Sequence, residues 1–179
     1  MKCWRRSFNI YLLAALVATG CGTGGLSPNK DYSTLRVFME SQPDDGTLVR
    51  VGHDKIPVYV KAEPALTEED VSSAKLVDNP DGTYSIEVKF SSHGAIVLDM
   101  ESTANRGRHM VFFCQLRPKR GSEDETELGK DLPWVSMMLI RSGISSGIVR
   151  FTPATSHEEA ERIVNGINSM VSGLGRLGN

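Results

Sequence analysis

The sequence has 179 residues, which is enough for one domain with a hydrophobic core and little more. Its 40% hydrophobic and 23% charged residues exclude a fully disordered, collagen-like or multi-span membrane chain. The formal net charge is −2, but the first 20 residues hold three basic side chains and no acid, so the remainder carries 17 basic against 22 acidic residues. This acidic body has no basic stripe and is a poor match for nucleic acid, whose binding rests on neutralised phosphates.

Residues 1–20 have the features of a signal peptide. Residues 1–6 are positively charged, residues 8–17 are apolar and uncharged, and three small residues precede Cys21. The apolar run is too short to cross a bilayer, because a spanning helix needs about 20 such residues. Small residues that end at a cysteine resemble the bacterial lipobox, in which the cysteine is lipidated and becomes the first mature residue. Ordinary secretion with an incidental cysteine is the alternative.

The other cysteines fit the lipoprotein interpretation. Cys3 leaves with the leader and Cys21 would be acylated, so Cys114 has no partner for an intramolecular disulfide. Acyl chains on Cys21 would hold the mature protein on a lipid bilayer. Residues 21–32 form the lipidated N-terminus and a Gly-, Ser- and Pro-containing flexible linker. Gly22 after the cysteine favours, by analogy with enteric lipoproteins, an outer-membrane anchor with the domain facing the periplasm.

A single α+β domain is predicted over residues 33–172. Apolar alternation and turn residues predict its elements in this order: strands at 35–40, 48–51 and 56–61, a short capped helix at 67–70, a hairpin with arms 74–78 and 83–90, a helix at 92–103, strands at 109–116, 133–140 and 148–151, and a final helix from Ser156. This order predicts a mainly antiparallel, curved sheet with two principal helices packed on one face.

The two helices are predicted with defined apolar faces. The face of the first consists of Ile96, Val97, Met100 and Ala104. The second begins with a capping box formed by Ser156 and Glu159, and ends at Gly173, so that residues 173–179 form a disordered tail. Its apolar face consists of Ala160, Ile163, Val164, Ile167 and Val171.

Residues 66–170 contain a series of short sequence motifs whose order along the chain is informative. They are Leu66-Thr67 with Asp70 and Ala74; the strand 85–90; Ser92, Gly94 and Ala95 opening a helix that ends at Thr103, Asn105 and Gly107; a strand from Met110; Pro133; Ile140 with Gly143; Ile148 and Phe151; and Glu158, Glu159 and Ala160. This ordered set resembles the head of the first periplasmic domain of SecD, the accessory subunit of the bacterial protein-export machinery. The resemblance implies an α+β head in which a curved sheet carries the two helices.

The sequence also departs from SecD. SecD has transmembrane helices that couple the proton gradient to export, and none is predicted here, so a part in export does not follow from the head. Arg150 stands where the family usually has glycine. A charged segment, 117–131, replaces a tight turn between two central strands, and binding residues often lie on loops held by a rigid scaffold. The candidate partner-binding residues of this loop are Arg117, Lys119, Arg120, Glu123, Asp124, Glu125 and Glu127.

No catalytic, cofactor or metal site is predicted. The sequence at 173–178 fits G-x-G-x-x-G but follows the last helix instead of joining a strand to a helix. Cys114 and His109 lie five positions apart on one strand and would face opposite sides, so the cysteine is interpreted as a core residue. Neither the four histidines nor the acidic residues 123–127 have metal-site spacing.

Two functions remain open for a non-enzyme of this kind. The first is a binding module, anchored in the bacterial cell envelope through Cys21, that engages an unidentified envelope protein or peptide by strand addition at a sheet edge or groove. The alternative is a structural or accessory lipoprotein that docks on a larger membrane complex, without a direct role in export. A single compact apolar patch would favour stable docking, whereas an open groove would favour peptide capture.

Overall fold

The computed structural model describes residues 30–117 and 134–177, with side chains placed as far as residue 174. The predicted signal peptide, Cys21 and all of the charged loop except Arg117 lie outside the described residues.

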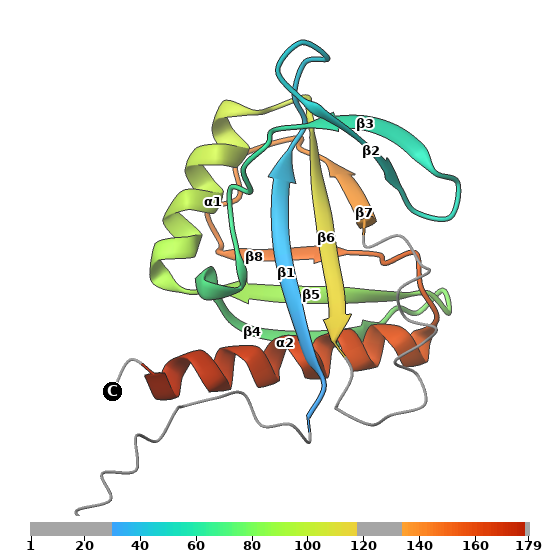
Figure 1. Cartoon of the computed structure of the whole chain (residues 1–179), viewed down its shortest axis with the longest axis vertical. Coiled ribbons are helices and arrows are strands. Elements are labelled where there is room, and N and C mark those ends of the chain that lie inside the picture. Colours follow the sequence, from blue (N-terminus) through green and yellow to red (C-terminus); the bar gives the residue numbers. More distant parts are fainter. Residues whose placement is uncertain (1–29, 118–133, 178–179) are drawn as a thin grey trace, which may run out of the picture.

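Within these ranges the elements confirm the predicted α+β class (Figure 1). The strands are β1 (Tyr32–Met39), β2 (Thr47–Val51), β3 (Ile56–Val60), β4 (Val71–Asp78), β5 (Tyr84–Phe90), β6 (His109–Arg117), β7 (Trp134–Leu139) and β8 (Ile148–Phe151). A 3-10 turn, η1 (Glu68–Asp70), and two helices, α1 (Ser92–Ala104) and α2 (His157–Leu177), complete the order. β1 begins one residue inside the predicted linker.

The strands form three antiparallel sheets. β1, β6 and β7 make the first, in the order β1-β6-β7, and β4, β5 and β8 make the second, in the order β4-β5-β8. The hairpin β2–β3 is the third. In Figure 1 the strands of the first sheet run vertically and those of the second run horizontally, so the two sheets cross, while α2 lies along the lower edge and α1 along one side.

The main core lies between the crossed sheets and α2. The apolar face predicted for α2 is confirmed, since Ala160, Ile163, Val164 and Ile167 are buried and Val171 packs against the same core while partly buried. Gly166 lets the helix approach β1 closely, because a Cβ atom there would lie 2.7 Å from the Ser33 nitrogen. The burial of this face is the main energetic reason for the helix, since apolar area removed from water contributes about 25 cal/mol per Å².

The predicted end of α2 at Gly173 is wrong, and so is the predicted disorder of residues 173–177. The helix continues through Gly173 as far as Leu177. A glycine that ends a helix usually takes a positive φ, and among the described residues Gly173 is not one of the glycines with that conformation. A glycine inside a helix lowers its stability by only about 1 kcal/mol relative to alanine, which the flanking turns tolerate.

A second core covers the other face of the β1-β6-β7 sheet. The β2–β3 hairpin packs its valines against Phe38 and Val111, and Trp134 lies against Phe38 with ring centroids 5.0 Å apart. Phe38 alternates along β1 with Leu35, Val37 and Met39, whose side chains lie in the main core, yet it is itself only 8% exposed. β1 is therefore buried on both faces, and its alternation in sequence reflects two cores instead of one core and solvent.

The apolar face predicted for α1 is wrong except at Val97, which packs against the main core, because Ile96, Met100 and Ala104 are exposed. The helix turns Gly94, Leu98 and Ser102 to the interior, while Ile96 and Met100 are 62% and 67% exposed. Gly94 fits against η1, where a Cβ would lie 2.7 Å from the Asp70 carbonyl oxygen. The Ser102 hydroxyl accepts a hydrogen bond from the Ile144 backbone nitrogen at 2.8 Å. Close contact through small residues fixes this orientation and leaves an apolar stripe outside.

Candidate functional site

The residues predicted to carry function are only partly within the described chain. Cys21 lies outside it, as do Lys119, Arg120, Glu123, Asp124, Glu125 and Glu127, so these stay predictions. Arg117 is the last residue of β6, where it pairs with Tyr32 and is exposed.

The cysteine at position 114 is a core residue, as predicted. Its side chain is buried in the main core, and burial raises the pKa of the thiol to about 12, so that it stays protonated at neutral pH. His109 lies at the other end of β6, with its Nδ1 atom 2.7 Å from Glu40 Oε2. The structure does not bring the two side chains together.

A small open cavity of about 300 Å³ is lined in part by Glu40, the partner of this histidine. Its lining is Glu40, Ser41, Gln42, Pro43, Pro57, Val58, Tyr59, Gly107 and Arg108. Burial opposes the charge on Glu40, but hydrogen bonds from the side chain and backbone of His109 outweigh it and hold the pKa of this carboxyl below its usual value. One carboxylate oxygen accepts both bonds, each at 2.7 Å. The carboxylate therefore fastens the start of β6 to the end of β1.

Two of the other histidines also pair with single carboxylates. His93 Nδ1 lies 2.9 Å from Asp70 Oδ1, and His157 Nε2 lies 3.1 Å from Asp78 Oδ1. Nowhere in residues 30–117 and 134–177 do three or more His, Cys, Asp or Glu side chains gather as metal ligands would. These pairs join neighbouring elements of the fold.

Two of the sheet edges are closed by other parts of the molecule. On β4, the side-chain amide of Asn168 accepts a hydrogen bond from the Ala74 nitrogen and donates one to the Ala74 oxygen, both at 2.9 Å. On β1, Val37 exchanges backbone hydrogen bonds of 2.9 and 2.8 Å with Leu66 and Ala65. An amide from α2 and an extended segment thus take the place of further strands.

In the part of the chain that the structure describes, the outer edge of β8 lacks a cover of the kind seen on β4 and β1. β8 pairs with β5 on one side and, within the described residues, with no strand on the other. The Phe90 nitrogen donates a hydrogen bond to the Gly147 oxygen at 2.9 Å, which makes these two residues a hydrogen-bonded pair of the antiparallel ladder. Such pairs occur at every second residue, so the backbone N–H and C=O groups of Val149 and Phe151 also face β5. The backbone groups of Ile148 and Arg150 consequently point to the outer edge.

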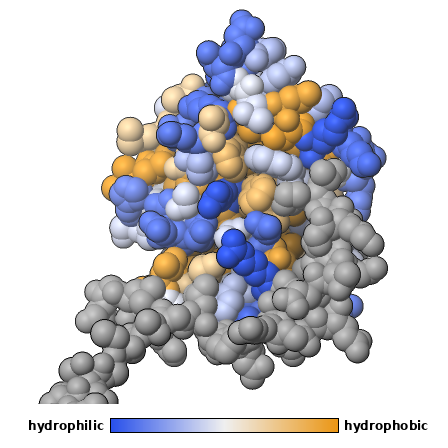
Figure 2. Space-filling view, in the orientation of Figure 1, coloured by the Kyte–Doolittle hydropathy of each residue, from blue (hydrophilic) through white to orange (hydrophobic). Residues whose placement is uncertain are grey.

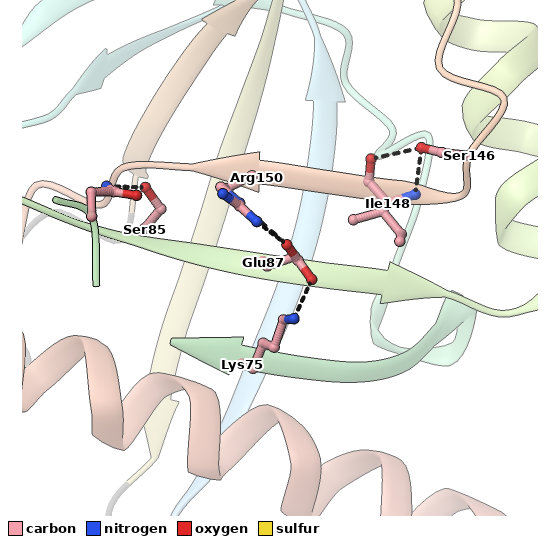
Figure 3. A network of polar contacts seen from close by, with 7 residues as sticks. Lys75, Ser85, Glu87, Ser146, Ile148 and Arg150 are labelled. Atoms are coloured by element: carbon pink, nitrogen blue, oxygen red, sulfur yellow. Dashed lines mark hydrogen bonds and ion pairs between the residues drawn. The ribbon is translucent and has the colours of Figure 1, made fainter. Parts of the chain in front are cut away.

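One hydroxyl occupies the start of this edge. Ser146 Oγ accepts from the Ile148 nitrogen and donates to the Ile148 oxygen, both at 3.3 Å, as the dashed lines in Figure 3 show. Both distances are beyond the 2.5–3.2 Å range of well-formed hydrogen bonds, so the contacts are weak. An incoming strand could replace them with shorter backbone bonds.

The outward face of the β4-β5-β8 sheet is polar and charged. Figure 3 shows Glu87 between Lys75 and Arg150 across three strands. Lys75 Nζ lies 2.9 Å from Glu87 Oε1, and Arg150 Nη2 lies 2.5 Å from Glu87 Oε2. The hydrogen bond from Lys75, then that from Arg150, lowers the pKa of Glu87. By the strand register this face also carries Ser73, Val77, Ser85, Lys89 and Ile148.

The exposed stripe on α1 is a second surface feature. Ile96 and Met100 stand one helical turn apart, and Figure 2 shows hydrophobic side chains at the edge of the molecule where α1 lies. The other large exposed hydrophobic residues of the described chain are dispersed over the hairpin, β7 and β8: Leu48, Ile56, Leu139 and Ile148.

Comparison with known proteins supports the fold alone. No family model matches the sequence, and no curated protein matches it. A solved structure of SecDF, described as a membrane component that enhances protein export, matches with a TM-score of 0.54 and 17% identity over 78% of this chain. SecDF in its super-membrane-facing form matches with a TM-score of 0.53 and 16% identity over 76% of this chain. The predicted SecD-like fold is confirmed.

The chain spans only part of these proteins, covering 63% of the first structure and 19% of the second. Among the described residues, neither helix is long and apolar enough to cross a membrane.

Proposed function

We propose that this protein is a non-catalytic binding module that captures an extended segment of another protein by strand addition along β8. The observation that carries the proposal is the outer edge of β8, where the Ile148 and Arg150 backbones point away from β5. Main-chain hydrogen bonds give such complexes much of their affinity. Within the β4-β5-β8 sheet, Asn168 closes the opposite edge at Ala74, which leaves β8 as the edge of this sheet that can accept a strand.

The module is tethered to the bacterial envelope through lipid on Cys21, with the outer membrane favoured and the domain facing the periplasm. The charged and apolar leader and the small residues before the cysteine support this anchor. Replacing the cysteine, Cys21→Ser, is expected to release the protein from the membrane fraction. A serine variant that still pellets with membranes in high salt would contradict lipid anchoring.

Crosslinking in cells tests the binding proposal. A photo-crosslinking amino acid in place of Ile148 is expected to give partner adducts, whereas one in place of Leu48 on the distant hairpin gives none. Arg150→Pro removes the outward N–H and is expected to abolish the adducts, while Arg150→Gln, which keeps it, reduces them a few-fold at most. Equal loss in both variants, or adducts from position 48 alone, would contradict strand addition at β8.

A second candidate function is stable docking on a larger membrane complex through α1. The exposed Ile96 and Met100 support it, because water-exposed apolar neighbours gain most from a partner surface. The double substitution Ile96→Ser and Met100→Ser is expected to release the lipoprotein from such a complex without unfolding it. If strand addition is the function, the crosslinks from position 148 survive this change.

A further inference from the structure

The chain has a surface whose charge is opposite to that of the rest of the molecule. After residue 20 the sequence carries 17 basic and 22 acidic residues. The outward face of the β4-β5-β8 sheet, by contrast, holds Lys75, Lys89 and Arg150 around the single carboxylate of Glu87, a net charge of +2. All three cations are exposed. A face of this kind attracts an anionic partner and repels a cationic one.

Arg150 belongs both to the positively charged face and to the open edge of β8. Its backbone N–H and C=O point toward the position of an added strand, while its side chain lies on the charged face. The guanidinium uses Nε and Nη2 for Glu87, at 3.2 and 2.5 Å. A guanidinium has five N–H donors, so donors remain after the bonds to Glu87. Lys75 occupies the other oxygen of that carboxylate.

We propose that the segment captured along β8 is selected for a carboxylate side chain directly opposite Arg150. This specificity rests on the proposed strand addition. In an antiparallel pair, directly opposed residues have Cβ atoms about 4.5–5.5 Å apart, so an Asp or Glu at this position reaches the guanidinium. The strand residue two positions away on the same face lies opposite Ile148, which is 38% exposed and favours an apolar neighbour. The recognised pattern is therefore an apolar and an acidic residue separated by one position.

The same charge disfavours a second copy of this chain as the occupant. If two β8 strands paired edge to edge with Arg150 opposite Arg150, the two guanidinium groups would meet across the strands, with Lys89 of each copy on the same charged face. Like charges opposite one another destabilise a strand pair, and charged residues at sheet edges commonly prevent self-association. An acidic peptide meets no such repulsion.

Peptide binding to the full-length chain in detergent tests the inference. The probes are three fluorescent ten-residue peptides of alternating Thr and Val, in which one central Val is replaced by Glu, Gln or Lys. By the size of cross-strand charge pairs, the Glu peptide is expected to bind about twofold to fivefold tighter than the Gln peptide, and the Lys peptide weakest. Arg150→Gln is expected to remove this ranking and Arg150→Glu to invert it. Arg50→Gln, a change at an exposed arginine of the β2–β3 hairpin, leaves it unchanged.

The experiment separates failure of the carboxylate specificity from failure of strand addition itself. Equal binding of the three peptides, unaffected by Arg150→Gln but lost in Arg150→Pro, would overturn the specificity and leave strand addition standing. Binding of none of them would overturn both. Arg150-dependent binding to phosphatidylglycerol vesicles without peptide binding would assign the charged face to lipid and overturn the inference. An Arg150-dependent dimer in sedimentation would overturn it in favour of a second copy.

Discussion

The two edge strands of the β4-β5-β8 sheet are treated differently by the rest of the molecule. Asn168 of α2 satisfies both backbone groups of Ala74 on β4 at 2.9 Å, with an amide that copies the geometry of a strand. On β8 the corresponding groups of Ile148 meet a serine hydroxyl from the same segment at 3.3 Å. Unpaired strand edges promote association. The comparison indicates which edge the fold closes for stability and which it leaves able to accept another chain.

The largest expected effect comes from breaking the helix that closes β4. Ile163 is 2% exposed in the main core, and Ile163→Asp would bury an unpaired carboxylate at a cost of several kcal/mol, against a total stability of about 5–15 kcal/mol. Circular dichroism is expected to show loss of the cooperative melt. Asn165→Asp, an exposed change on the same helix, is the control and is expected to melt like the unaltered chain. A cooperative melt of Ile163→Asp near the control temperature would contradict the observed face of α2.

Proline scanning along β8 tests the direction of its backbone groups. Val149→Pro removes an N–H that faces β5 and a buried side chain, so it is expected to destabilise the fold by about 2–3 kcal/mol. Arg150→Pro removes an N–H that faces outward and is expected to have less than half that effect. Urea unfolding measures both. Equal destabilisation by the two prolines would mean that the outer edge of β8 is already paired.

Opening the closed edge gives a smaller effect. Asn168→Ala leaves the Ala74 nitrogen and oxygen without their side-chain partner, at an expected loss of about 1–3 kcal/mol in urea unfolding. The variant is also expected to gain a tendency to self-associate, measured by light scattering, since it exposes β4. Asn165→Ala on the exposed side of the helix controls for helix propensity. Unchanged stability would show that the amide does not close this edge.

The smallest effect concerns the ion pairs of the charged face. The folded-state pKa of Glu87 is lowered by Lys75 and Arg150, so its contribution to stability is present above the ordinary value of 4.5 and is lost as the pH falls through the lower, folded-state pKa. Exposed ion pairs contribute little. Glu87→Gln is expected to be slightly less stable at pH 7 and indistinguishable in acid below the folded-state pKa. A difference that grows on acidification would contradict the sign of this linkage.

Sequence patterns predicted the buried face correctly for elements that pack through large apolar side chains. The face of α2 follows from its branched apolar residues, such as Ile163 and Ile167, and the hairpin arm at 83–90 follows from strict alternation. For α1 the same reasoning failed, because Leu98 is its only fully buried large side chain, flanked by the closely packed Gly94 and Ser102, and Ile96 lies outside. The periodicity of apolar residues does not show whether a helix packs through its large side chains or through small residues that bring its backbone close to a neighbour.

The candidate site was predicted only in part. Alternation along the hairpin arm is enough to place Glu87 and Lys89 together on one polar face of the strand. The partners on β4 and β8 depend on strand register, which brings Lys75 and Arg150 from positions 12 and 63 residues away in the sequence. Closure of the β4 edge by Asn168 is also a long-range contact, and nothing in the local sequence distinguishes this asparagine from Asn165. Open and closed edges are properties of the assembled fold.

Amide hydrogen exchange along β8 tests the strand-addition account most directly. The Val149 N–H, which faces β5, is expected to exchange slowly in the free protein, and the Arg150 N–H, which faces outward, to exchange fast. Addition of the Glu-containing peptide is expected to slow exchange at Arg150 and leave Val149 unchanged. An Arg150 amide that is already protected in the free chain, or one that stays fast when the peptide is bound, would contradict strand addition at this edge.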